Sequence, residues 1–226
     1  HAGEMRRSSA RAKQFGLRVD EAQVDGPAVM ARVHAVTDRL RKGVESLLKA
    51  RRVAVFRGRG RLTSPRRIDI DDGPDAGRSI EAGAIVLATG SRPIRPGFLP
   101  FSGGRVWTTD EAIASEGLPR SVVIVGGGVI GCEFATAWAA LGVQVTLVEM
   151  LDRLAGVMPA DASRAIGRSL KKRRVDVRLG AKIVSARETD SGITVEMGEG
   201  ASLETERVLA CVGRVPNVEG IGLEDL

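Results

Sequence analysis

The sequence between residues 122 and 133 decides the fold, and it reads VVIVGGGVIGCE. Its leading apolar residues predict a buried strand, and the glycines that follow open a predicted helix. In such a strand–turn–helix unit, Gly126 permits the tight turn, Gly128 lets a pyrophosphate approach the backbone, and Gly131 lets the helix pack against the strand. The spacing therefore predicts a dinucleotide-binding turn, and a glycine-rich turn that holds no ligand is the alternative.

A carboxylate stands where the next strand ends. That strand is predicted over Val143 to Val148, and Glu149 follows it, 23 residues after Gly126. A carboxylate at this point accepts hydrogen bonds from both ribose hydroxyls of NAD and repels the 2′-phosphate of NADP. No arginine comes directly after the acid, although Arg153 lies close enough in the sequence to reach a phosphate. The pattern favours NAD over NADP and leaves NADP open.

The rest of the C-terminal half alternates between strands and helices. Short apolar runs predict the strands, and Asp161 is placed to cap a helix. This alternation is typical of a Rossmann-like α/β domain, which we expect to span residues 119–212. The predicted elements are strands over 121–125, 143–148, 175–179, 183–186, 193–197 and 208–212, and helices over 129–141 and 161–173.

The N-terminal half predicts a long helix followed by a small antiparallel sheet. Apolar residues recur at spacings of three and four in the helix, and at a spacing of two in the strands. One later apolar run predicts a strand covered on both faces, and a proline-containing segment predicts an irregular crossing between domains. These elements are the helix 27–50, strands over 53–60 and 68–70, the buried strand 85–88 and the crossing 92–118.

Composition narrows the classes of function. No apolar run reaches the length of about 18 residues that a membrane span needs. The two cysteines, Cys132 and Cys211, lie 79 positions apart, have no metal-ligand spacing and indicate two small apolar residues. Residues 1–68 carry 17 Lys/Arg against 6 Asp/Glu, but the chain has no tyrosine to stack on bases, and arginine outnumbers lysine 28 to 6 throughout. We therefore expect no metal, no membrane partner and no nucleic-acid partner.

Three motifs stand in the order found in one family. Ala88-Thr89-Gly90-Ser91 comes first, the strand–turn–helix of 118–135 second, and Gly213-Arg214-Val-Pro216-Asn217 third. This order resembles the pyridine nucleotide-disulfide oxidoreductases, most of all the dihydrolipoamide dehydrogenases, along essentially all 226 residues. The resemblance implies an α/β, Rossmann-like fold of flavoproteins that bind two dinucleotides. Its implied parts are a partial FAD-binding domain at 1–118, a nearly complete NAD-binding domain at 119–212 and a return toward the FAD domain at 213–226.

The resemblance also implies which residues meet FAD and NAD. The glycine-rich turn would hold NAD, with Glu149 on the adenosine ribose. Glu133 matches a glutamate that supports catalysis by pairing with a lysine beside the flavin, and that lysine is not in this sequence. The implied NAD contacts are Gly126, Gly127, Gly128, Val129, Ile130, Gly131, Cys132, Glu133, Glu149, Ile183 and Gly213, and the implied FAD contacts are Gly60, Thr89, Gly90 and Ser91.

For the whole protein, the resemblance implies electron transfer from dihydrolipoamide to NAD through a redox disulfide and FAD. The dithiol would be carried on the lipoyl domains of 2-oxo acid dehydrogenase complexes, and the enzyme would be a cytoplasmic homodimer. The family's redox disulfide and its dimerisation domain with a His–Glu pair lie outside this sequence. Neither the two cysteines nor His1 and His34 are placed to replace them, so we expect a central fragment that is inactive alone.

Other interpretations stay open. Mercuric reductase, soluble transhydrogenase and glutathione reductase share the motifs, although Glu149 and Gly131 argue against the NADP-linked members. A non-catalytic nucleotide-binding module would carry the same turn. A basic nucleic-acid binder would show salt-dependent retention on a polyanion column.

Overall fold

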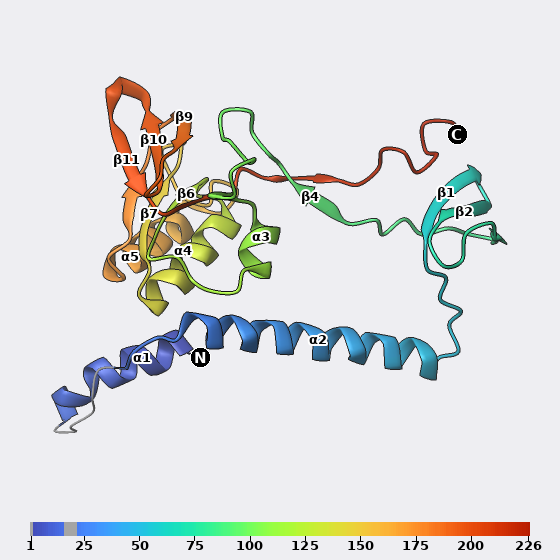
Figure 1. Cartoon of the computed structure of the whole chain (residues 1–226), viewed down its shortest axis with the longest axis horizontal. Helices are drawn as coiled ribbons and strands as arrows, with labels where there is room; N and C mark the ends of the chain where they lie inside the picture. Colours follow the sequence, from blue (N-terminus) through green and yellow to red (C-terminus); the bar gives the residue numbers. More distant parts are fainter. Residues whose placement is uncertain (1, 16–21) are drawn as a thin grey trace. The chain divides into compact units, whose positions relative to one another are not determined.

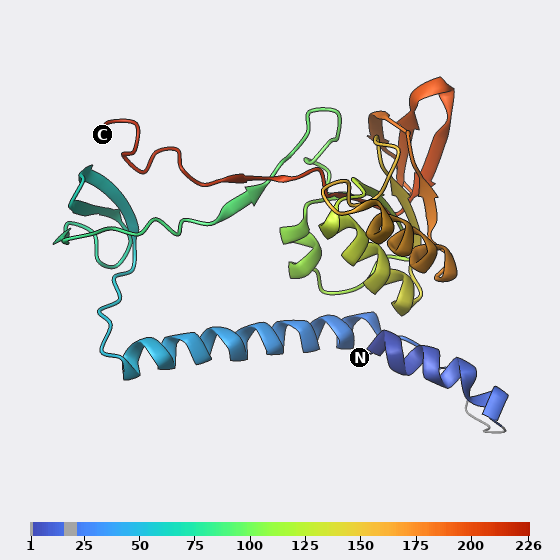
Figure 2. The same ribbon diagram turned by 180° about the vertical axis from the view of Figure 1, so that it is seen from behind.

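A computed structural model describes residues 2–15 and 22–226 of the chain (Figure 1; Figure 2 gives the view from behind). The chain divides into two compact units. The first consists of the residues up to 35 together with 93–213, and the second of 36–92 together with 214–226. The units are described separately below, and the domain bounds expected from the sequence stay a prediction.

The first unit is built around a five-stranded sheet in which every neighbouring pair is parallel. The strand order is β5-β12-β6-β7-β8. Parallel neighbours need crossover connections, and helices supply them here. The strands are β5 (Val106–Trp107), β6 (Ser121–Val125), β7 (Gln144–Val148), β8 (Asp176–Arg178) and β12 (Arg207–Ala210), and the crossover helices are α4 (Val129–Leu141) and α5 (Ala160–Lys172).

The path of the chain through this sheet fixes where a ligand can bind. From β6 the chain passes through α4 to β7 and through α5 to β8, and it then returns to β12 on the other side of β6. The strand order thus reverses between β6 and β12. In doubly wound sheets, ligands bind beyond the carboxyl ends of the strands at such a reversal. The predicted α/β fold with its βαβ crossovers is confirmed.

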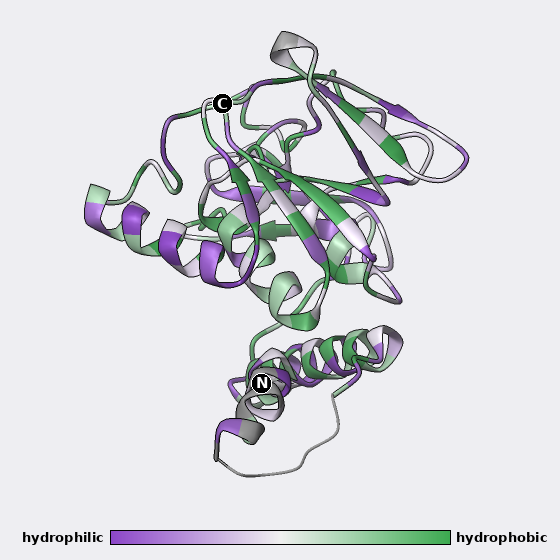
Figure 3. Ribbon diagram, turned by 90° about the vertical axis from the view of Figure 1, so that its left-hand side faces the viewer, coloured by the Kyte–Doolittle hydropathy of each residue, from purple (hydrophilic) through white to green (hydrophobic). Residues whose placement is uncertain are grey.

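The parallel sheet is covered on both faces. Val122 and Ile124 of β6 pack on the side of α4 and α5, whereas Val123 and Val125 pack on the side of a small antiparallel sheet. This alternation follows from the two-residue period of a strand, and full coverage explains why β6 is apolar throughout. Figure 3 shows green, the hydrophobic end of its colour scale, along parts of the strands, beside white and purple polar positions. The small sheet has the order β11-β10-β9, with β9 (Ile183–Glu188), β10 (Ile193–Met197) and β11 (Ser202–Thr205), and the turn η2 (Gly198–Gly200) follows β10.

The segment 92–118 is more regular than the sequence predicted. It holds β5 and the short helix α3 (Thr109–Ala114), and β4 (Ser91–Pro93) precedes them. Thr108 caps α3: its hydroxyl oxygen accepts from Asp110 N at 3.2 Å, while the Glu111 carboxylate accepts from Thr108 N at 2.8 Å. This reciprocal capping box needs a Thr-x-x-Glu pattern, which the sequence contains at 108–111. The predicted irregular crossing is therefore confirmed for 94–105 and wrong for β5 and α3.

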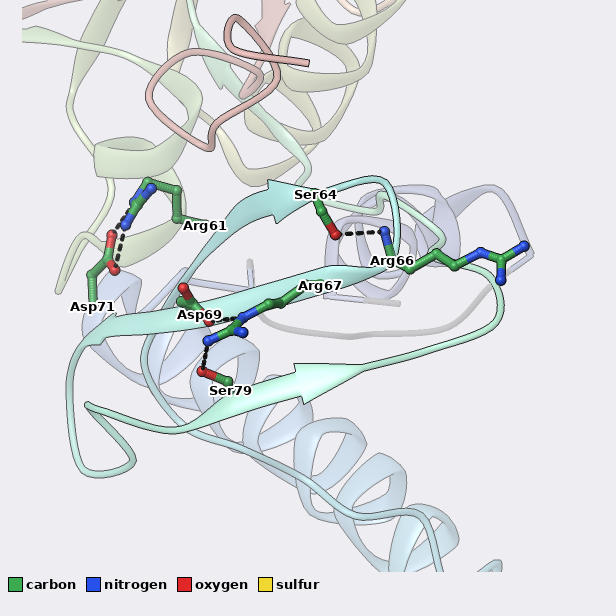
Figure 4. Close-up of polar contacts among 7 residues, drawn as sticks. All are labelled: Arg61, Ser64, Arg66, Arg67, Asp69, Asp71 and Ser79. Carbon is green, nitrogen blue, oxygen red and sulfur yellow. Dashed lines mark hydrogen bonds and ion pairs between the residues drawn. The ribbon is translucent and has the colours of Figure 1, made fainter.

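The second unit contains an antiparallel meander of β1 (Arg59–Ser64), β2 (Arg67–Asp72) and β3 (Ser79–Glu81). Leu62 and Ile70 are buried in it. Ion pairs lie across the exposed surface of the strands (Figure 4): Arg61 Nε meets Asp71 Oδ2 at 2.6 Å, and Arg67 Nε meets Asp69 Oδ1 at 2.9 Å. Exposed pairs of this kind contribute little to stability. The antiparallel pairing predicted around residues 68–70 is confirmed.

Two other predictions in this region are wrong. The first strand begins at Arg59, and residues 53–58 lie outside it, with Val53 and Val55 exposed. The apolar run of 85–88 is not a strand, and the side chain of Val86 is 89 % exposed. A strand exists only where a second strand shares its hydrogen bonds. No described strand of this chain pairs with 85–88, so its apolar composition alone was misleading.

The helices before the meander are α1 (Ala2–Arg11), η1 (Ala12–Phe15) and α2 (Gly26–Ala50). The predicted helix over 27–50 is confirmed by α2, which Asp25 caps by accepting from Ala28 N at 2.9 Å. The His34 ring lies on α2 with Nε2 3.1 Å from the carbonyl oxygen of Ile113. Among the described residues, no helix is long and apolar enough to cross a membrane.

Candidate nucleotide-binding site

A cavity of about 460 Å³ lies at the carboxyl ends of the parallel strands of the first unit. Residues that follow β6, β7, β8 and β12 form its wall, so it sits at the reversal of strand order. Sheets of this class bind nucleotides at this place. The lining residues are Phe98, Val125, Gly126, Gly128, Val148, Glu149, Met150, Ala181, Lys182, Ile183, Cys211, Val212 and Gly213.

The three fingerprint glycines have three different surroundings. Gly126 has a φ of +104°, in the left-handed region, and a Cβ there would collide with the carbonyl of Cys211. A Cβ on Gly131 would collide with the carbonyl oxygen of Gly126. A Cβ on Gly128 would meet nothing within 4 Å. Gly126 and Gly131 are therefore required by the protein's own packing, whereas Gly128 leaves open space beside the backbone, as close approach of a pyrophosphate requires.

The amino end of α4 supplies the partners for a phosphate. The helix begins directly after Gly128, and no side chain caps it. Because the first N–H groups of a helix lack intrahelical acceptors, they and the positive end of the helix dipole attract anions. The glycine-rich turn and this helix end together fit the pyrophosphate of a dinucleotide.

Glu149 lies at the end of β7, partly buried and on the wall of the cavity. Two backbone groups hold its carboxylate: Gly127 N donates to Oε2 at 2.6 Å, and Leu151 N donates to Oε1 at 2.8 Å. Each oxygen keeps a further lone pair for a ribose hydroxyl. The guanidinium of Arg153 donates to the Gly156 carbonyl at 2.6 Å and does not line the cavity. Among the lining residues, the one with a cationic side chain is Lys182, which the sequence did not single out.

The two cysteines are free thiols near the glycine-rich turn. Cys132 is buried in α4 and donates through Sγ to the Gly127 carbonyl at 3.3 Å, and Cys211 follows β12. Burial raises the pKa of the Cys132 thiol to about 11 and that of the Cys211 thiol to about 12. Both therefore stay protonated at neutral pH, and the expectation of two small apolar side chains agrees with this environment.

We expect iodoacetamide to alkylate Cys132 roughly 100-fold and Cys211 roughly 1000-fold more slowly at pH 8 than it alkylates the guanidinium-unfolded chain, because the thiolate is the nucleophile. The rate should rise continuously up to pH 10. Since the folded pKa values lie above the unfolded ones, the folded state keeps its protons longer, and stability falls as pH rises from about 9 toward 12. Mass spectrometry of each cysteine peptide checks this, and a rate that levels off near pH 8 would contradict it.

Two of the family-like motifs meet in the second unit. Asn217 donates from Nδ2 to the Thr89 carbonyl at 3.1 Å and from its backbone N to the Gly90 carbonyl at 3.0 Å. Arg214 donates from Nε to Ser91 Oγ at 2.8 Å. Beside these contacts β4 pairs with β13 (Arg214–Pro216). Arg214 and Asn217 thus shape the loop that the sequence associated with FAD, a role that only the three-dimensional pairing reveals.

Some of the expected site residues line the cavity and others do not. Five of the expected NAD residues line the cavity, and the other six belong to the turn or to the first residues of α4 behind it. Glu133 is exposed on that helix, and Gly60 lies on β1, opposite Ile70. The five lining residues are Gly126, Gly128, Glu149, Ile183 and Gly213, and the other six are Gly127, Val129, Ile130, Gly131, Cys132 and Glu133. Within the described part of the chain, no cluster of three or more potential metal ligands occurs.

Comparison with known proteins bears directly on this geometry. Residues 3–226 match the family model of the pyridine nucleotide-disulphide oxidoreductases. The chain belongs to this family. It is 34 % identical to the dihydrolipoyl dehydrogenase of Bacillus subtilis over 99 % of its own length and 50 % of that protein. It is 31 % identical to the soluble pyridine nucleotide transhydrogenase of a Marinomonas species over 88 % of its own length and 43 % of that protein.

A solved structure agrees with these relatives. The crystal structure of LpdA from Mycobacterium tuberculosis superposes with a TM-score of 0.86 at 29 % identity, covering all of this chain and 50 % of that one. The two-dinucleotide flavoprotein fold expected from the sequence is thereby confirmed, and the chain spans about half the length of the relatives it matches. Members of this oxidoreductase family use FAD and NAD as cofactors.

Proposed function

We propose that this chain provides the NAD site of an NAD-linked flavoprotein disulfide oxidoreductase that oxidises dihydrolipoamide to lipoamide. The observation that carries the proposal is the Glu149 carboxylate, held by two backbone N–H groups on the wall of a cavity whose glycine-rich turn is open at Gly128. The turn and the amino end of α4 would hold the pyrophosphate, and Glu149 would accept from the adenosine ribose. Ile183 and Gly213 would line the adenine and nicotinamide ends.

FAD, when bound, carries electrons between a dithiol–disulfide pair and NAD. In this proposal the chain's own residues position the two cofactors. Glu133, exposed at the first turn of α4, serves the nicotinamide side. Gly60 and the loop 89–91, which Asn217 and Arg214 shape by hydrogen bonds, serve FAD. Residues 1–118 would then contribute to the FAD domain, 119–212 would form the NAD domain, and 213–226 would return toward the FAD domain.

The same proposal covers the partners. Dihydrolipoamide on the lipoyl domains of 2-oxo acid dehydrogenase complexes would be the substrate, and the whole protein would act in the cytoplasm as a homodimer. The dihydrolipoyl dehydrogenases among the relatives support this assignment. Because the chain covers half of those relatives, we expect the 226 residues alone to be inactive with lipoamide and NADH.

The protein purified from its full reading frame should show flavin absorption bands. These bands should bleach when NADH is added anaerobically, much less with NADPH, and return when lipoamide is added. A colourless protein would contradict the flavoenzyme proposal. Bleaching without recovery by lipoamide would leave the NAD site supported and the dithiol substrate wrong.

Soluble transhydrogenase is a second candidate, since one relative carries that name. It requires comparable reaction with both nucleotides. Equal bleaching by NADH and NADPH, together with transfer between the two nucleotides and no reaction with lipoamide, would favour it.

A further inference from the structure

Gly127, between the first two fingerprint glycines, is the residue on which several parts of the site converge. The fingerprint leaves this position unspecified. In this chain its N–H donates to Glu149 Oε2 at 2.6 Å. Its carbonyl oxygen accepts from Ala155 N at 2.7 Å and from Cys132 Sγ at 3.3 Å. Both backbone polar groups of Gly127 are thus used within the protein, and the orientation of the turn depends on them.

A leucine from the segment that follows β7 fills the space beside Gly127. A Cβ on Gly127 would lie 2.6 Å from Leu154 Cδ2 and 3.0 Å from Glu149 Cβ. The Leu154 side chain is 2 % exposed, within the core that α4 covers. Leu154 therefore packs against Gly127 from the side of the core. The side chain of Glu149 also packs against Gly127.

The segment 150–156 that carries Leu154 is held in an unusual conformation. Ala155 has a φ of +45°, a region that residues with a Cβ rarely adopt. Such a conformation persists only where its surroundings enforce it. Here Ala155 is 1 % exposed and donates to Gly127, and Leu151 accepts from Gly180 N at 2.9 Å. The segment is tied at both ends, so it can act as a fixed support.

The consequence reaches Glu149. Its two backbone donors come from the glycine-rich turn, through Gly127, and from the supporting segment, through Leu151. A carboxylate that is already fixed loses no conformational entropy when the nucleotide binds. This favours binding of a ribose with a free 2′-hydroxyl. The fixed carboxylate also cannot turn away from a 2′-phosphate, so the two negative charges repel each other and NADP binds more weakly. Lys182 on the same wall would otherwise attract that phosphate.

We propose that Leu154 is a positioning residue: by packing against Gly127 it fixes the Glu149 carboxylate and so sets the preference for NAD over NADP. This inference rests on the proposed NAD site. Removing part of the Leu154 side chain frees the backbone at Gly127 to rotate, and the carboxylate then gains freedom to move aside for a 2′-phosphate.

The test compares Leu154→Ala and the milder Leu154→Val with Leu170→Ala in the whole protein. Leu170 is a fully buried leucine of α5 in the same core, and the atoms nearest to a Cβ on Gly127 belong to Leu154 and Glu149 instead. Leu154→Met, which conserves side-chain volume, serves as the rescue variant. With the flavin reduced beforehand under anaerobic conditions, so that it cannot accept hydride, the dissociation constant of NADH is followed by energy transfer from the tryptophans, and that of NADPH by displacement of NADH. Neither measurement needs turnover.

We expect the ratio of the NADPH to the NADH dissociation constant to fall at least tenfold in Leu154→Ala, and less in Leu154→Val. It should return toward the wild-type value in Leu154→Met and stay unchanged in Leu170→Ala, although both alanine variants melt at lower temperature. An unchanged ratio in both Leu154→Ala and Leu154→Val, or an equal fall in Leu170→Ala, would overturn the inference while leaving the NAD site intact. A wild-type protein that binds neither nucleotide would instead overturn the proposed function as well.

Discussion

Gly128→Ala is expected to abolish tight binding of NADH while the protein melts at its usual temperature. The residue has φ −66° and ψ −175°, which alanine adopts without strain, and the added Cβ meets no protein atom within 4 Å. The methyl group would instead occupy the space through which a pyrophosphate reaches the backbone of the turn. We expect the dissociation constant to rise roughly 100-fold, which corresponds to about 2.8 kcal/mol.

Titration of the anaerobic protein with NADH after its flavin has been reduced, followed by energy transfer from tryptophan, measures this change. The matched control is Gly167→Ala, since Gly167 lies within α5 and a Cβ there also meets nothing within 4 Å. The control should bind NADH normally. Unimpaired binding by Gly128→Ala would show that the turn does not contact the pyrophosphate.

Gly131→Ala is expected to have the opposite signature, a loss of stability. A Cβ at this position collides with the carbonyl oxygen of Gly126, which is a backbone atom and cannot move without displacing the whole turn. Overpacking of this kind costs about 1–3 kcal/mol, and we expect the upper part of that range because both partners belong to the buried junction of β6 and α4. NADH binding should weaken as well, because the displaced turn is the one that carries Gly128.

Urea unfolding monitored by circular dichroism gives the free energy of unfolding for this variant. Gly167→Ala is again the control, and it should gain about 0.5–1 kcal/mol because alanine replaces glycine inside a helix without new contacts. If Gly131→Ala were as stable as the wild type, the close packing between α4 and β6 would be wrong.

The elements around the glycine-rich turn could be predicted because their signals are local. The bounds of β6 and α4 agree with those predicted, and β7 differs by one residue, since apolar runs and glycine spacing specify them without reference to distant residues. By contrast, β4 and β5 are three and two residues long, and they exist because β13 and β12, more than 100 residues later, pair with them. No local pattern encodes such a strand. The capping box at Thr108 was the exception, because its signal was present in the sequence.

The candidate site shows the same division. The glycines and Glu149 follow from motif spacing, and the structure places them on one cavity, while their contacts with NAD stay a prediction. Phe98 and Lys182 reach the same cavity from segments with no nucleotide signature, so only the tertiary fold reveals them. The role of Gly127 was likewise hidden, because the residues that restrain it, Leu154 and Ala155, come from an irregular segment.

The pairing of β12 with β6 has a consequence for the order in which the protein forms. Val208 stands opposite Val123, so residues paired between the two strands that flank the strand-order reversal lie 85 positions apart in the chain. Contacts of such sequence separation require closure of a large loop and are slow to form. Cys211, Val212 and Gly213, which follow β12, complete the cavity wall. During synthesis, the β6–α4–β7 unit can therefore collapse early, whereas nucleotide affinity arises only after β12 has left the ribosome and inserted beside β6.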